Sequence, residues 1–146
     1  MNIAIKTFKE LNTTELYNIL QLRTEIFVVE QDCVYQDMDY KDQKALHVIG
    51  LKNNKLVAYT RIFKAGDYFQ EASIGRVVVL LSERKYGYGV EIMQASIQAI
   101  KEKFQETTVR ISAQRYLLKF YSSMGFTSVG EEYLEDGIAH VNMIKK

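Results

Sequence analysis

The segment with the clearest chemical signal is Arg84-Lys85-Tyr86-Gly87-Tyr88-Gly89, which directly follows an apolar run and opens a helical pattern. Glycine has no Cβ atom, so the backbone N–H groups around Gly87 and Gly89 can converge in a concave turn. The beginning of a helix adds roughly half a positive charge, and Arg84 and Lys85 supply formal charges beside it. Together these features favour a phosphate site, with a diphosphate as the natural ligand.

Two glycines at this spacing also fit a tight turn that binds no ligand. The surroundings favour the phosphate site, because the turn lies between an apolar strand pattern and a well-formed helix pattern. A Rossmann site requires a third glycine where this chain has Ile92, and the predicted strand at 107–112 ends without a ribose-binding acid. The Gly-Lys-Ser/Thr ending of a P-loop is also missing. The predicted diphosphate site therefore belongs to neither of these common nucleotide folds.

The elements that must position this turn follow from the spacing of apolar residues. Period-two alternation, short apolar runs and turn residues predict strands at 3–8, 45–51, 55–63, 74–80, 107–112, 127–135 and 138–144. Helical spacing predicts a first helix capped by Thr13 or Thr14, a second that spans 88–104, and a third that contains residues 117–124. The order β α β β β α β α β β indicates an α/β (α+β) fold, in one domain over residues 1–146.

Composition excludes partners that are held by bulk charge. The 146 residues carry 19 basic and 18 acidic side chains, a net charge of +1, which argues against a protein that coats nucleic acid or a membrane surface. The single cysteine, Cys33, cannot form an internal disulfide and fits a reducing compartment. No apolar run is long enough for a signal peptide or a membrane span. We therefore expect a cytoplasmic protein.

Several separated motifs resemble those of one known family. The strand, the RxxGxG turn, the helix, the next strand, and a helix carrying Phe120-Tyr121-Ser122-Ser123-Met124-Gly125-Phe126 resemble the core of the GNAT N-acetyltransferase superfamily over nearly the whole chain. A narrower resemblance is to the ElaA-type subfamily. It rests on Arg23 with Phe27-Val28-Val29-Glu30-Gln31, Cys33 and Tyr35 with Asp37 and Asp39, Ile74-Gly75-Arg76-Val77, Ala113-Gln114, and Glu135-Asp136-Gly137-Ile138 with His140. Val34 and Ala139 stand where that subfamily often has proline.

The resemblance implies a GNAT fold, with a mixed central sheet of about six to seven strands, flanking helices and a cleft for acetyl-CoA between two splayed parallel strands. Backbone groups of Val77 and Val79 would pair with the pantetheine arm, and the glycine turn would hold the pyrophosphate. Backbone groups of Val78, Val79 or Leu80 would polarise the thioester carbonyl. The coenzyme-binding residues implied are Val77, Val78, Val79, Arg84, Lys85, Tyr86, Gly87, Tyr88, Gly89, Gln114 and Tyr121. No metal is implied.

The implied reaction is direct attack of an amine on the thioester, which needs a general base and a general acid. Tyr121 matches the family tyrosine that protonates the leaving thiolate, although its place on an apolar helix face also fits simple aromatic packing. The base is open. Glu71 and His47 are the two main candidates, while Glu30, His140 and a chain of waters are alternatives, and either histidine could instead be structural.

An acidic window from Glu30 to Asp42 holds five acids and one base. In the family this region closes over the acceptor, so the window could attract a cationic amine or could be an ordinary solvated loop. The acceptor-binding residues predicted on this basis are Glu30, Asp37, Asp39 and His140. Cys33 lies among these acids, which disfavour a thiolate, and we interpret it as a packing or loop residue.

The sequence thus favours an acyl-CoA-dependent N-acetyltransferase that acts on a primary amine of a small molecule or a peptide. The alternative is a GNAT-shaped module that binds CoA or another protein without turnover. The acceptor is not determined by these motifs, because one fold serves many amines. Neither nucleic acid nor a membrane is expected as a partner, and a homodimer is compatible with the family.

Overall fold

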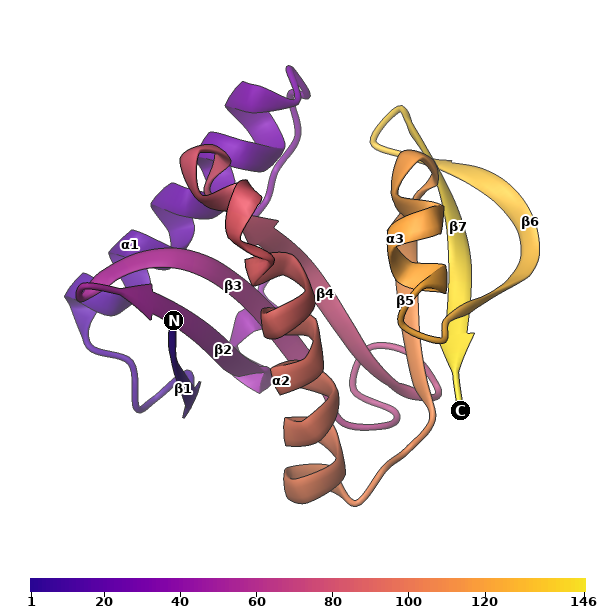
Figure 1. The fold of residues 1–146 in the computed structure, drawn as a ribbon, viewed down its shortest axis with the longest axis horizontal. Helices are drawn as coiled ribbons and strands as arrows, with labels where there is room; N and C mark the ends of the chain where they lie inside the picture. Colours follow the sequence, from indigo (N-terminus) through magenta and orange to yellow (C-terminus); the bar gives the residue numbers. More distant parts are fainter.

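Seven strands form one sheet in the order β1-β2-β3-β4-β5-β7-β6, in a computed structural model that describes all residues, 1–146 (Figure 1). The strands are β1 (Asn2–Thr7), β2 (Leu46–Lys52), β3 (Lys55–Phe63), β4 (Ala72–Val79), β5 (Val109–Gln114), β6 (Thr127–Glu135) and β7 (Ile138–Lys145). The helices are α1 (Thr13–Thr24), α2 (Tyr88–Phe104) and α3 (Leu118–Ser122). Short 3-10 segments occupy Asp42–Lys44, Leu81–Tyr86 and Arg115–Leu117, and a π-helical segment, Glu25–Glu30, continues α1. Because β4 and β5 run parallel among antiparallel neighbours, the sheet is mixed, and the predicted fold class and element order are confirmed.

The ends of the helices follow local capping chemistry. Helix α1 is capped by Asn12 rather than by a threonine: its side chain accepts a hydrogen bond from the Glu15 N–H at 2.7 Å, and the Glu15 carboxylate accepts one from the Asn12 N–H at 2.9 Å. This reciprocal pair satisfies the backbone N–H groups of both Asn12 and Glu15. A cap at Thr13 would lose the pairing, because Glu15 would no longer stand three residues after the cap. Helix α2 has the predicted bounds and begins after Gly87, whose φ of +74° suits glycine. No helix is both long enough and apolar enough to cross a membrane.

Helices cover both faces of the sheet. Helix α1 packs on one face, where Ile19 and Leu22 meet Ile49 and Tyr59 in a small apolar core. Helices α2 and α3 lie on the other face, over the larger core (Figure 1). Since side chains alternate along a strand, each central strand sends one set of residues to each core.

The sheet divides into two wings because β4 and β5 pair over only two residues each. Ala72 pairs with Val109 and Ser73 with Arg110, and beyond these pairs the strands diverge (Figure 1). A bulge in β4 shifts its register against β3 between the Tyr59 and Arg61 pairings, and Arg76 takes a φ of +50° there. A bulge bends and twists its strand, which turns the end of β4 away from β5. We call β1–β4 with α1 and α2 the first wing, and β5–β7 with α3 the second wing.

Candidate active site

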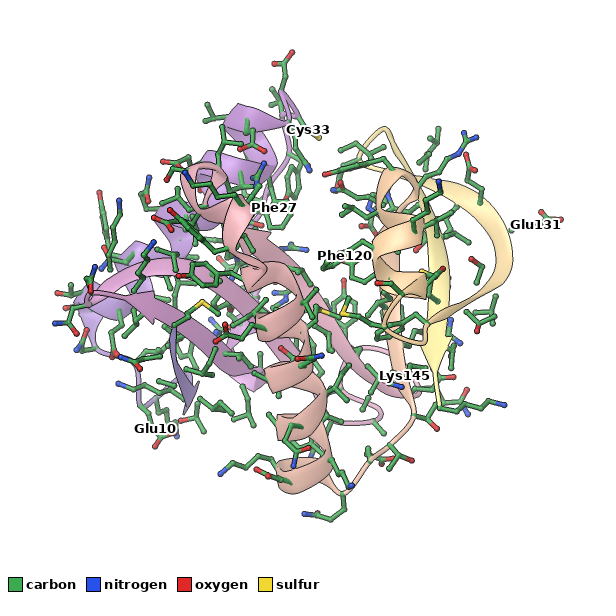
Figure 2. All side chains as sticks on the ribbon, in the orientation of Figure 1. Glu10, Phe27, Cys33, Phe120, Glu131 and Lys145 are labelled. Atoms are coloured by element: carbon green, nitrogen blue, oxygen red, sulfur yellow. The ribbon has the colours of Figure 1, made fainter.

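A cleft of about 410 Å³ opens where the two wings diverge. Residues from both faces of the sheet line it. From the side of α2 and α3 come Ile111, Leu117, Phe120 and Tyr121, and from the side of α1 come Arg61, Ser73, Ser112 and His140. Figure 2 shows Phe27 on the first wing and Phe120 on the second, on opposite sides of the opening.

The edge of β4 offers backbone groups to a ligand. Val77, Val78 and Val79 all line the cleft, and β4 has no partner strand on its β5 side after Ser73. Buried backbone groups need hydrogen-bond partners, so an extended ligand could pair with this edge like an added strand. One of these groups is already engaged, because the Val79 carbonyl accepts a hydrogen bond from Arg84 Nε at 2.9 Å.

The glycine turn lies at the end of the same strand. Gly87 and Gly89 line the cleft, and the first N–H groups of α2 have no acceptor within the helix. A Cβ atom at Gly89 would lie 3.2 Å from Phe120 Cζ, so a side chain there would press on the other wing. Arg84 also lines the cleft, with its Nη1 atom 2.8 Å from the Glu30 carboxylate.

The other predicted phosphate-site side chains lie elsewhere. Lys85, Tyr86 and Tyr88 do not line the cleft. Tyr86 instead has the Lys52 Nζ atom 4.0 Å from its ring centroid, and its ring is 5.6 Å from that of Tyr88.

Tyr121 lies on the cleft wall and is 5% exposed. Its ring makes edge-to-face contacts with Phe120 and Phe126, so it packs as an aromatic residue and also borders the cleft. Burial raises the pKa of its hydroxyl, with a smaller contribution from Tyr116. The phenol therefore stays protonated at neutral pH, the state a general acid requires.

The two main base candidates are not in the cleft. His47 is fully buried, with Nδ1 2.6 Å from the Tyr59 hydroxyl and Nε2 2.9 Å from the Asp42 carbonyl, and burial lowers its pKa. Glu71 accepts two hydrogen bonds from Arg110, at 2.7 and 3.1 Å, which lower its pKa. Neither residue lines the cleft. The prediction that His47 or Glu71 takes a proton from the acceptor is corrected by this placement: both are held by structural partners.

A largely buried cluster of three arginines and three aspartates lies beside the cleft, which two of its arginines line. We call it the arginine–aspartate cluster; its members are Arg23, Arg61, Arg76, Asp37, Asp39 and Asp42. Asp42 lies at its centre, with one carboxylate oxygen 2.8 Å from Arg23 Nη1 and 2.9 Å from Arg61 Nη1. Arg23 is fully buried, so its charge depends on these carboxylates.

Asp37 and Asp39, two further acids of the window, are also paired with arginines. Asp37 lies 2.8 Å from Arg23 Nε and 2.8 Å from Arg76 Nε, and Asp39 lies 2.6 Å from Arg61 Nη2. With Glu30 bound to Arg84, three of the four predicted acceptor-binding residues have their charges neutralised by arginine. This arrangement favours a structural role for the window, which fixes the irregular segment 31–41 to the first wing.

Because these carboxylates are paired, the free energy of unfolding should fall when acid protonates them. Burial alone would raise the pKa values of Asp39 and Asp42, but hydrogen bonds and charges from Arg61 and Arg23 outweigh it and lower both. Carboxylates with lowered folded pKa values stabilise the fold above their unfolded value of about 3.9 and lose that effect as the pH falls further. We expect the urea midpoint to be flat from pH 7 to pH 5 and to fall steeply below pH 4. A midpoint that is unchanged down to pH 3 would contradict this expectation.

His140, the fourth predicted acceptor residue, does line the cleft. Its Nδ1 atom lies 2.7 Å from the Ile138 carbonyl, and its Nε2 atom lies 3.4 Å from the Glu135 carboxylate. Its ring stacks on Tyr133, with the centroids 6.0 Å apart.

Polar contacts join the wings across the cleft. The side-chain amides of Gln31 and Gln114 exchange hydrogen bonds of 3.0 and 3.2 Å, so the predicted coenzyme residue Gln114 is engaged here. The Cys33 thiol donates to the Asp136 carbonyl at 3.3 Å, which agrees with its interpretation as a loop residue. These contacts hold segment 31–41 against the second wing.

Among the polar cleft residues with no predicted catalytic or binding role are Ser73, Arg61 and Glu135. The Ser73 hydroxyl and the Arg61 Nε atom are buried without a hydrogen-bond partner, and Glu135 accompanies His140. Arg61 interrupts an apolar strand pattern and Ser73 directly precedes one, a signal that points to both residues. Glu135 stands in an acidic hairpin, so only its place in the Glu135-Asp136-Gly137-Ile138 motif marks it.

Comparison with known proteins decides the family. The model of the acetyltransferase (GNAT) domain matches residues 13–146. The chain belongs to the GNAT acetyltransferase family. Protein ElaA of Escherichia coli is 41% identical over 139 residues, covering 94% of this chain and 91% of ElaA. A UPF0039 protein of Schizosaccharomyces pombe is 42% identical over 145 residues, covering 98% and 95%. The crystal structure of an acyl-CoA N-acyltransferase from Pseudomonas aeruginosa matches all of both chains with a TM-score of 0.92 and 37% identity.

The predicted resemblance to ElaA is therefore confirmed, and the GNAT fold is a scaffold for acyl-CoA chemistry. In this GNAT chain the cleft brings together the β4 edge, the glycine turn, Tyr121 and His140.

Proposed function

We propose that this protein is an N-acetyltransferase that takes its acetyl group from acetyl-CoA and transfers it directly to a primary amine. The proposal rests on the cleft between β4 and β5, which has a strand edge, a helix N-terminus and a protonated phenol along one path. Each part matches one part of acetyl-CoA: the amide-containing pantetheine arm, the pyrophosphate and the leaving sulfur.

The chain's own residues account for binding. The free edge of β4 at Val77 to Val79 pairs with the pantetheine amides, and the N–H groups around Gly87 and Gly89 hold the pyrophosphate. Arg84 reaches the phosphates by exchanging its contact with Glu30. The aromatic wall at Phe120 excludes water from the thioester.

The proton balance also involves these residues. A new C–N bond forms between the amine nitrogen and the thioester carbonyl carbon, and the C–S bond breaks. Tyr121 donates its proton to the departing sulfur and regains one from the attacking nitrogen. The acceptor ammonium loses its other proton to a base, and from there to solvent.

A binding module without turnover is the competing function. The presence of a protonated tyrosine in the cleft favours the enzyme, because binding the coenzyme alone needs no phenol. The test is a thiol-release screen with acetyl-CoA and a panel of primary amines, with products identified by mass spectrometry. Acetyl-CoA binding without thiol release for any amine would favour the module.

Acetyl-CoA binding should depend on Arg84. We expect Arg84→Met to weaken binding at least about tenfold in isothermal titration, since a hydrogen bond to a charged group contributes about 1.5–3 kcal/mol. Arg115→Met is the matched control, because it removes an exposed arginine that is 3.5 Å from Glu132 and outside the cleft. No wild-type binding below millimolar concentration would contradict the proposal.

A further inference from the structure

The face of the sheet on the side of α1 carries a row of polar side chains. On β5 and β7 the residues Ile111, Ala113, Val141 and Met143 belong to the core under α2 and α3. Alternation therefore directs Ser112, Gln114 and His140 to the opposite face. His140 is in register with Gln114 on one side and with Tyr133 on the other, so these side chains stand next to one another.

The ring of His140 is held in one orientation. The Ile138 carbonyl can only accept a hydrogen bond, so Nδ1 carries the hydrogen and Nε2 has a lone pair when the ring is neutral. That lone pair lies 3.4 Å from the Glu135 carboxylate, and both groups are acceptors. A donor with several N–H groups beside them would satisfy both, and an alkylammonium ion is such a donor.

Glu135 differs from every other carboxylate discussed for this site. Glu30, Asp37 and Asp39 each pair with an arginine in the cleft or the cluster. Glu135 has no arginine or lysine partner; it lies beside His140, whose ring is neutral in its base form, and its side chain is 46% exposed. Its negative charge is therefore available to a cation in the cleft.

The surroundings of the pair point to the same kind of ligand. Asp136 follows on the hairpin turn and also lines the cleft, with its carbonyl accepting from the Cys33 thiol. On β6, Tyr133 stacks on His140 and bonds to Ser112, and burial raises the Tyr133 pKa, so it adds no charge at neutral pH. No basic side chain is bound to the pair.

A separate observation indicates that this face binds a polar ligand. The hydroxyl of Ser73 and the Nε atom of Arg61 lie on the same face of the cleft, in residues that are each 1% exposed, and neither atom has a hydrogen-bond partner. An unpaired buried donor costs about 1–3 kcal/mol. A ligand with hydrogen-bonding groups would relieve that cost.

We propose that Glu135 and His140 form the acceptor-ammonium site: Glu135 binds the cationic amine and His140 Nε2 removes its proton before attack. This inference rests on the proposed function. The N–H bond of the ammonium breaks, its proton passes to His140 and then to solvent, and the freed nitrogen lone pair attacks the thioester. Tyr121 supplies the thiolate proton from the α3 side. The acceptor class is a primary aliphatic amine, which is cationic at neutral pH, rather than an arylamine, which is not.

The test compares two nucleophiles with acetyl-CoA at pH 7.5. One is 1,4-diaminobutane or Nα-acetyl-lysine, whichever the wild-type enzyme acetylates faster, and the other is hydroxylamine, which is largely uncharged at that pH. For the aliphatic amine we expect His140→Gln to lower kcat about 100-fold. Glu135→Gln should raise the amine KM about tenfold. For hydroxylamine both variants should stay within about threefold of wild type.

Glu131→Gln is the matched control, since Glu131 lies on the same strand and Figure 2 shows it on the outer side, away from the cleft. Acetyl-CoA binding by calorimetry checks that each variant is folded. Equal losses for both nucleophiles, or no loss for either, would overturn the inference while leaving the proposed function intact. A wild-type enzyme that releases no thiol with any nucleophile would overturn the proposed function, and this inference with it.

Discussion

Tyr121→Phe should lower kcat by about 10²–10⁴-fold while acetyl-CoA binds as well as it does to the wild type. The phenol is the acid on the cleft wall whose pKa burial raises, so it holds its proton until the thiolate forms. Phenylalanine keeps the edge-to-face contacts with Phe120 and Phe126. Packing is therefore preserved, and the loss should appear in kcat rather than in stability.

The measurement is thiol release at saturating acetyl-CoA, with melting temperature and coenzyme affinity recorded for the same preparation. Tyr17→Phe is the control, because Tyr17 is 74% exposed on α1 and is remote from the cleft lining. A rate within about twofold of wild type across the pH range would show that Tyr121 serves only as an aromatic packing residue.

Asp42→Asn should destabilise the fold by about 3–5 kcal/mol, the usual cost of removing one partner from a buried ion pair. One Asp42 oxygen contacts both Arg23 and Arg61, which are 0% and 1% exposed. Asparagine has the same size but no charge, so the variant leaves excess positive charge in a place that water does not reach. Segment 31–41 should loosen with it, because Asp37 and Asp39 share the same arginines.

Chemical unfolding with urea measures this effect, with Arg115→Met as the surface reference, for which the change should stay within about 0.5 kcal/mol. A loss of less than about 1 kcal/mol for Asp42→Asn would mean that water or a rearranged arginine compensates the missing charge. Amide hydrogen exchange in residues 31–41 should rise in the variant before exchange in the strands does.

The local architecture could be predicted from the sequence because local patterns determine it. The apolar spacing from Tyr88 to Phe104 predicts the observed bounds of α2, and the Asp136-Gly137 turn predicts the β6–β7 hairpin. The glycine turn was also recognisable, since its chemistry lies in consecutive residues. Each of these features depends on residues that are close together in the chain.

The pairing of charges could not be predicted in this way. Asp42 is 19 residues from each of its two arginine partners, and Gln31 meets Gln114 across 83 residues. Whether an acid in the window is free or neutralised depends on these distant contacts. The places of His47 and Glu71 outside the cleft could not be predicted for the same reason, because strand spacing does not show which histidine or glutamate borders the opening between the wings.

The divergence of β4 and β5 leaves an opening that passes through the sheet rather than a pocket on one surface, since residues from both faces border it. In the proposed reaction, coenzyme and acceptor therefore approach from opposite faces of the sheet and meet inside this opening. In that proposal segment 31–41 and the β6–β7 hairpin border the acceptor side, and neither forms part of the glycine turn. We therefore expect substitutions in these two segments to change which amine is accepted without changing the affinity for the coenzyme.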